Sequence, residues 1–357
     1  MWKPLHRQPH FATQTRKRAR EEEPNGSFLT NPQTDKLNCE NVEVHGLEVG
    51  HASMQGYRVS MEDEHVIEPL ELPKHLLLAI MDGHAGKFSA KYVARELRHT
   101  LEATEQWAAY CKLSPLDREK APALGLVSQA LVQAYTDLDA DLRLMDAKGL
   151  MDESGTTAVC AVVTPSHVIC ASVGDSRCVV GSTRTGSTTA LSEDHKPSNP
   201  EERVRIEAAG GFVLSDRVNG ELAMSRALGD FRYKRDPALL SKPKEQQVIC
   251  FPDVAVHKRS GKKDEILILA CDGVWDVVSN AESVAYLADI VLRDDFRAKK
   301  AEAERISAKH NGKNKKNKEG AVAGVHVTAQ EAAESLIELA FTDGSTDNIS
   351  AICVKYL

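Results

Sequence analysis

The sequence predicts a mixed α+β protein in one large domain, because strand signals alternate with helix signals along most of its 357 residues. Two apolar runs, residues 76–83 and 266–273, each end on an Asp-Gly pair and are typical of buried strands. Two further runs, residues 156–163 and 166–174, are separated only by Thr164 and Pro165, which predicts a hairpin. A hydrophobic content of 42% supplies enough apolar material for a sizeable core.

The remaining elements follow from local signals. Helices are expected over residues 88–102 and 123–147. Asn199-Pro200 should open a short helix that Gly210 ends. Thr328 and Glu331 have the spacing of a capping box and predict a helix from there. Residues 348–356 are expected to form a closing strand.

Two segments lack the periodicity of folded elements. Residues 1–42 are polar and carry a basic run, residues 16–20, so we predict a flexible basic or polar tail. The basic run is interpreted as solvated charge, with a nuclear-import signal as the alternative. The folded domain then spans residues 43–357, and its Lys-rich stretch at about 293–325 is predicted to be a surface insertion.

Charge and cysteine content exclude several classes of protein. A net charge of -7 argues against general binding to nucleic acid or to anionic membranes. No apolar run approaches the roughly 20 residues of a membrane-spanning helix. The eight cysteines form no C-x-x-C pair, and no signal peptide is visible, so we expect a reduced protein in the cytoplasm, the nucleus or both.

Acidic side chains stand at the ends of the apolar runs, where their burial is costly unless a cation neutralises them. Oxygen ligands of this kind favour Mg²⁺ or Mn²⁺ over Zn²⁺ or Cu²⁺. Each one alone is more typical of a turn, but the set together favours a metal site. The set comprises Glu62, Asp63, Asp82, Asp175, Asp272 and Asp347.

These residues lie within motifs that resemble the metal-dependent protein serine/threonine phosphatases of the phosphatase 2C type. In order along the chain, the motifs are GYRVSMEDEH (56–65), MDGHAG (81–86), SGTTAV (154–159), VGDSR (173–177), LSEDHKP (191–197), AMSRALGDF (223–231), ILILACDGVWDV (266–277) and GSTDNISAICV (344–354). The resemblance covers about residues 45–357. It implies a central two-sheet antiparallel β-sandwich flanked by α-helices, with αββα layers and a metal centre at one end.

The resemblance also implies a ligand set for two Mg²⁺ or Mn²⁺ ions and a weakly bound third. Asp82 would bridge the two, Asp272 and Asp347 would complete one site, and the carbonyl of Gly83 would serve the other. Glu62 would act through water and Asp63 would lie close by. Asp175, with Asp272, would hold the third ion.

Three more residues acquire roles in the same way. Arg58 would bind the substrate phosphate, His84 would be the general acid, and Asn348 would hold metal-bound water. Residues 197–226 would form a flap beside the site. The family often has glycine after the histidine where this chain has Ala85, and we expect Ala85 to be tolerated if its φ stays negative.

The resemblance implies hydrolysis of phosphoserine and phosphothreonine in protein substrates by metal-activated hydroxide, without a covalent phosphoenzyme. This chemistry is physically consistent, because water between two divalent cations loses a proton near neutral pH. An arginine fork matches two phosphate oxygens, and a nearby imidazolium can protonate the leaving alkoxide. The resemblance further implies a monomer. The sequence does not identify the substrate protein.

Three other interpretations remain open. Residues 178–185 fit the C-x-x-G-x-x-R loop of cysteine-dependent phosphatases, although a strand followed by a polar turn is the simpler interpretation. The chain could instead be a metal-holding docking module that acts through its tail and insertion. A metal-dependent nuclease would also use clustered carboxylates, but it should show a basic channel.

Overall fold

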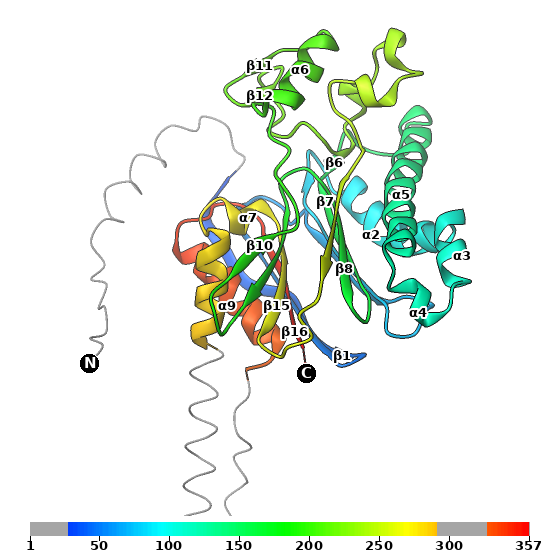
Figure 1. Ribbon diagram of the computed structural model, residues 1–357. Helices are drawn as coiled ribbons and strands as arrows, with labels where there is room; N and C mark the ends of the chain where they lie inside the picture. Colours follow the sequence, from blue (N-terminus) through cyan, green and yellow to red (C-terminus); the bar gives the residue numbers. More distant parts are fainter. Residues whose placement is uncertain (1–27, 291–326, 357) are drawn as a thin grey trace, which may run out of the picture.

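The computed structural model describes residues 28–290 and 327–356, in which two antiparallel sheets lie face to face between two layers of helices (Figure 1). The first sheet has the order β1-β2-β16-β15-β9-β10, and the second has the order β14-β8-β7-β4-β3. All neighbouring strands in both sheets run antiparallel. The predicted α+β sandwich with αββα layers is therefore confirmed.

The strands of the first sheet are β1 (Phe28–Val44), β2 (Leu47–Arg58), β16 (Ile349–Tyr356), β15 (Glu265–Ala270), β9 (Arg177–Ser182) and β10 (Thr188–Ala190). Those of the second sheet are β14 (Asp253–Lys258), β8 (His167–Val173), β7 (Ala158–Val163), β4 (Leu76–Met81) and β3 (Glu64–Pro69). The predicted hairpin is confirmed as β7 and β8, which pair from Ala158–Val173 to Val163–Val168.

Strand β4 shows why the predicted strands are apolar at every position. Successive side chains of a strand point to opposite faces of the sheet. Leu76, Leu78 and Ile80 pack between the two sheets, whereas Leu77 and Met81 pack in the core beneath the helices. Both faces of the strand are therefore buried, and no position along it can be polar without a cost.

Helices cover the two outer faces. The second sheet is covered by α2 (Phe88–Glu102) and α5 (Ala121–Ala147), and α3 (Glu105–Cys111) and α4 (Pro115–Arg118) pack against α5. The first sheet is covered by α7 (Asp272–Trp275), by residues 280–290, and by α9 (Ala329–Thr342). The Thr328 side chain accepts a hydrogen bond from the backbone N–H of Glu331, and the Glu331 side chain accepts one from the backbone N–H of Thr328. The predicted capping box is therefore confirmed.

Strand β1 corrects the predicted extent of the tail, because residues 28–42 pair with β2. Most of its side chains are exposed, which explains why the sequence shows no apolar periodicity there. The strand is held through its backbone and by Lys36, whose Nζ lies 2.8 Å from Glu334 and 2.7 Å from Glu338 on α9. Residues 1–27 and the predicted insertion at 293–325 lie outside the described residues.

A small lobe stands beside the sandwich, over the residues that the resemblance assigned to a flap. It contains the predicted helix as α6 (Pro200–Ala208), and the hairpin of β11 (Val213–Leu214) and β12 (Arg217–Val218). Its own core includes Ile206, Val218 and Val248. Buried Glu202 is bonded by Arg205 and Arg226 at 2.8 Å each, which ties α6 to the chain that returns to the sandwich.

Short elements complete the fold at the same end of the molecule. Strands β13 (Leu228–Gly229), β6 (Gly155–Thr156) and β5 (Gly83–His84) form a three-stranded sheet. The turns η1 (Phe231–Tyr233), η2 (Pro237–Leu239) and η3 (Pro243–Glu245) lead back to β14. Among the described residues, no helix combines the length and apolar character needed to cross a bilayer.

Candidate metal centre and active site

The sandwich brings the predicted carboxylates together at one end, although they are far apart in the sequence. Asp82 follows β4, Asp272 begins α7 directly after β15, and Asp347 stands just before β16. Both sheets therefore contribute side chains to one cleft of about 780 Å³. Its lining includes Arg58, Glu62, Asp82, Gly83, His84, Asp272, Asp347 and Asn348. Of the predicted residues, only Asp63 and Asp175 are not part of this lining, and both are buried.

Electrostatic repulsion within the group is strong. Burial, followed by the charges of Asp272 and Asp63, raises the pKa of Asp82 well above its usual value. Burial and the charge of Asp175 likewise raise the pKa of Asp272 well above its usual value. Burial raises the pKa of Asp63 to about 7. Divalent cations among these oxygens would offset both the repulsion and the loss of solvation.

Two buried carboxylate oxygens support the fit to a metal. Asp63 Oδ1 and Asp175 Oδ1 have no hydrogen-bond partner in the described part of the chain, although such groups are normally satisfied. The second oxygen of Asp63 accepts from Ser350 Oγ at 2.6 Å, and that of Asp175 lies 2.5 Å from Lys196 Nζ. An all-oxygen donor set of this kind suits Mg²⁺ or Mn²⁺.

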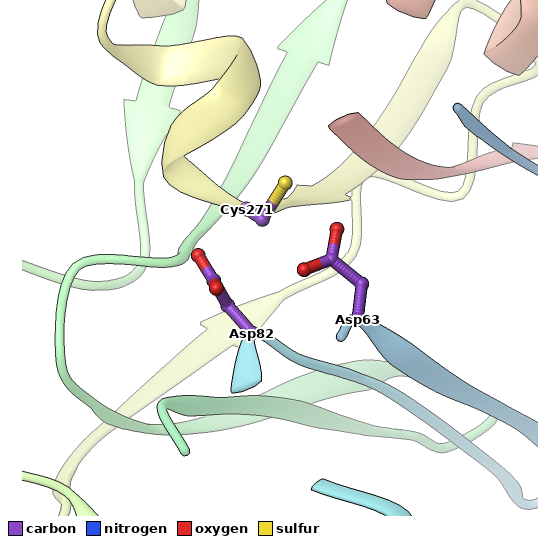
Figure 2. A group of neighbouring side chains, drawn as sticks. All are labelled: Asp63, Asp82 and Cys271. Atoms are coloured by element: carbon purple, nitrogen blue, oxygen red, sulfur yellow. The ribbon is translucent and has the colours of Figure 1, made fainter. Parts of the chain in front are cut away.

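Cys271 lies between two of these carboxylates, which the sequence analysis did not anticipate. Figure 2 shows Asp63, Asp82 and Cys271 close together, and one donor atom from each lies within 4.8 Å of the others. Burial and the neighbouring carboxylates raise the pKa of the thiol well above its usual value. Its Sγ accepts from the Ser350 N–H at 3.1 Å. A protonated sulfur is a poor ligand for hard cations, so Cys271 fills space beside the oxygens.

Asp276 is a further acidic residue of the cleft that sequence reasoning missed. Burial raises its pKa above the usual value. It stands four residues after Asp272, and its backbone N–H donates to the carbonyl of Asp272 at 2.8 Å. Because residues four apart share a helix face, this spacing was a signal that could have identified Asp276.

Arg58 and Asn348 link the cleft to the loop between β2 and β3. Arg58 Nη2 donates to Asp347 Oδ2 at 2.6 Å, and its side chain is 44% exposed, so it remains accessible from the cleft. Asn348 Oδ1 accepts from the N–H of Glu62 at 2.8 Å. Its Nδ2 donates to the carbonyls of Gln55 and Ser60. Asn348 thus holds the loop that carries Glu62, a connection the sequence did not reveal.

Gly83 is packed tightly against the same loop. A Cβ atom at this position would lie 2.5 Å from the carbonyl oxygen of Glu62, so only glycine fits without displacing the loop. The peptide of Gly83 is therefore held close to the peptide of Glu62.

His84 is held by Asp230, a residue within a motif already noted but given no role. His84 Nε2 lies 2.7 Å from Asp230 Oδ2, and Asp230 is only 4% exposed. Burial alone would lower the pKa of His84, but the charge and hydrogen bond of Asp230 outweigh it and leave the pKa above its usual value. A Cβ atom on Gly155 would lie 2.2 Å from Asp230 Oδ2 and 2.5 Å from His84 Nε2, so glycine is required there.

The condition placed on Ala85, a negative φ, is not met. Its φ is +56°, and Gly86 follows at +135°. The chain reverses here between β5 and α2, and a left-handed residue makes that reversal, at a cost of roughly 1 kcal/mol for a residue with a Cβ.

The alternative cysteine mechanism is contradicted by the position of its nucleophile. Cys178 lies on β9 and is fully buried between the sheets. The loop after it leads into β10, so no helix N-terminus is present to receive a phosphate.

Comparisons with known proteins agree with this geometry. The family model described as "Protein phosphatase 2C" matches residues 47–349. The chain is 40% identical over 277 residues to Protein phosphatase 1B of Mus musculus, with 76% of this chain and 68% of that protein covered. It is 38% identical over 262 residues to Protein phosphatase 1A of Homo sapiens, with 72% and 65% covered.

A third relative, Protein phosphatase ppm-1.A of Caenorhabditis elegans, is 36% identical over 283 residues, with 76% of this chain and 58% of that protein covered. The chain thus spans about six tenths of the length of the curated relatives that it matches. Among solved structures, a serine-threonine phosphatase 2C from Toxoplasma gondii has a TM-score of 0.65 at 22% identity, covering 92% of this chain and all of that one. At that identity, the likeness shows the fold.

Proposed function

The chain belongs to the protein phosphatase 2C family, and we propose that it hydrolyses phosphoserine and phosphothreonine in other proteins, using bound Mg²⁺ or Mn²⁺. Membership implies dependence on these metals and phosphoprotein substrates. The observation that carries the proposal is the convergence of Asp82, Asp272 and Asp347 from both sheets on one cleft, with Arg58 and His84 beside them.

The carboxylates are proposed to hold the cations. Asp82 is the candidate for a bridging ligand, because it lies near all the other acidic residues of the group. The charges of Asp272, Asp63, Asp347 and Asp175 each raise its pKa. Asp272, Asp347 and the Gly83 carbonyl complete the proposed pair of sites, and Glu62 and Asp63 support them. Asp175 is the candidate for a weaker third site. When bound, the cations would lower the pKa of attacking water and neutralise phosphate charge.

Arg58 is proposed to bind the phosphate. Its Nη2 is oriented by Asp347, which leaves the rest of the planar fork available to two phosphate oxygens. The positive charge also selects the dianionic ester over neutral groups.

His84 is proposed to donate a proton to the leaving serine or threonine oxygen. Asp230 accepts from its Nε2 and favours the imidazolium. The other proton of the imidazolium is on Nδ1, a buried atom with no partner in the described part of the chain, and this is the proton proposed for transfer once the leaving oxygen lies against the ring.

Release of phosphate from a phosphothreonine peptide tests the proposal. Wild type should be active with Mn²⁺ or Mg²⁺ and inactive with chelator. Asp272→Asn keeps the size of the side chain but removes a charge, and it should lower the rate by about 100-fold or more. Asp343→Asn, an exposed change beyond α9, is the matched control and should behave as wild type. A folded, metal-loaded wild type that releases no phosphate would refute the proposal.

Several finer points remain part of the proposal. Each active site is proposed to hold two cations and a third that binds more weakly, and the molecule is proposed to be a monomer. Metal titration by calorimetry and sedimentation analysis of the full chain measure these two quantities.

A further inference from the structure

We propose that Phe28, at the start of β1, is a positioning residue for the phosphate-binding arginine. The inference rests on the role proposed for Arg58. The two residues are direct cross-strand partners, Phe28 as the first residue of β1 and Arg58 as the last of β2. The Arg58 Cζ lies 5.3 Å from the centroid of the Phe28 ring, within the range of a cation–π contact. Phe28 lies in the segment that was predicted from the sequence to be a flexible tail.

Arg58 needs such support because its side chain is long and 44% exposed. A free arginine side chain gives up considerable rotamer entropy when it is held in one orientation. Asp347 fixes only the Nη2 end, through its 2.6 Å hydrogen bond. An aromatic ring beside the guanidinium restricts the orientation of the rest of the fork, which must match the phosphate oxygens.

The burial of apolar surface does not account for Phe28. Its exposed fraction is 38%, and it belongs to none of the apolar cores formed by the described residues. A large apolar side chain that is this exposed contributes little to folding. Its ring contact is with Arg58, so its effect should appear in phosphate binding.

The rest of β1 is attached to the sandwich by side-chain contacts as well as by its pairing with β2. Lys36 binds two glutamates of α9, and His51 of β2 bonds through Nδ1 to the carbonyl of Asn38 at 2.8 Å. These contacts anchor the middle of β1 to α9 and to β2. The strand thus brings Phe28 beside Arg58, a residue that lines the cleft.

The test uses the full chain with saturating Mn²⁺ and two substrates, para-nitrophenyl phosphate and a phosphothreonine peptide. Phe28→Leu keeps an apolar side chain but removes the ring, and it should raise KM about two- to fivefold for both substrates with little change in kcat. Phe28→Tyr retains the ring and should restore the wild-type KM. Thr30→Ala, an exposed change two residues along β1, is the matched control.

A double-mutant cycle with Arg58→Ala completes the test. If Phe28 acts through Arg58, then Phe28→Leu should cause no further loss in the Arg58→Ala background. An equal loss in both backgrounds would overturn the proposal, as would a loss confined to the peptide, which would indicate a contact with the peptide chain. Metal-dependent activity of wild type in the same assay separates failure of this inference from failure of the proposed function.

Discussion

The buried ion pair between α5 and the segment after η1 provides a strong test of the packing. Asp139 Oδ1 lies 2.6 Å from Lys234 Nζ, and the two side chains are 9% and 3% exposed. The same Asp139 oxygen accepts from the N–H of Gly229 at 2.9 Å. Lys234 Nζ also donates to the carbonyl of Ala227 at 2.9 Å. The pair therefore supports the backbone immediately before Asp230, the residue that holds His84.

The change Asp139→Leu leaves the lysine charge buried without a counter-ion. Breaking a buried pair in this way costs about 3–5 kcal/mol. Total stabilities of domains are about 5–15 kcal/mol, so this is a large fraction. For a domain of this size, the melting temperature should fall by about 6–20 °C.

The double change Asp139→Leu with Lys234→Met removes both charges and should recover most of that loss. The N–H of Gly229 would still lack its acceptor, at a cost of about 1–3 kcal/mol. Because Asp230 is adjacent to Gly229, the double variant should fold but show a lower kcat than wild type.

Urea unfolding followed by tryptophan fluorescence measures the free energy of unfolding of the wild type, both single variants and the double variant. If Asp139→Leu lowered the free energy of unfolding by less than about 1 kcal/mol, the reasoning would be refuted, because the pair would then have to be solvated. A double-variant loss equal to the sum of the single losses would refute it too, because the charges would then be uncoupled.

Three further outcomes are expected. Gly155→Ala should push Asp230 away from His84 and lower kcat by about 10-fold or more, with metal affinity unchanged by calorimetry. Ala85→Gly should raise the free energy of unfolding by about 0.5–1 kcal/mol, because it relieves a left-handed φ; a decrease would contradict that conformation. The pKa of Glu202 is held at about 2, below its unfolded value near 4.5. The ionised Glu202 therefore contributes up to about 3 kcal/mol to the free energy of unfolding. This contribution is complete above about pH 5 and is lost as the pH falls through 2. Glu202→Gln should therefore lower the free energy of unfolding more at pH 7 than at pH 3, and a difference that does not change with pH would argue against the shift.

Local signals were sufficient for most of the regular structure. The run at residues 76–81 is apolar at every position because β4 is buried on both faces, and that pattern is visible without any tertiary information. The capping box of Thr328 and Glu331 is a contact between residues three apart, so it too could be identified directly.

Strand β1 was missed for the opposite reason. Its side chains are mostly exposed, and its place in the sheet depends on backbone bonds to β2 and on ion pairs to α9, which lies about 300 residues away in the sequence. Such contacts leave no periodic pattern, because nothing local requires a particular side chain at each position.

The sequence by itself determined the alternating elements, the two strand ends that carry Asp82 and Asp272, and the family to which the chain belongs. Only the tertiary structure decided that Asp230 holds His84, that Asn348 anchors the loop of Glu62, and that Phe28 reaches Arg58. These partners are separated by 146, 286 and 30 residues. Each pairing depends on the path of two strands or loops in space, and a residue type alone does not encode which distant partner it will meet.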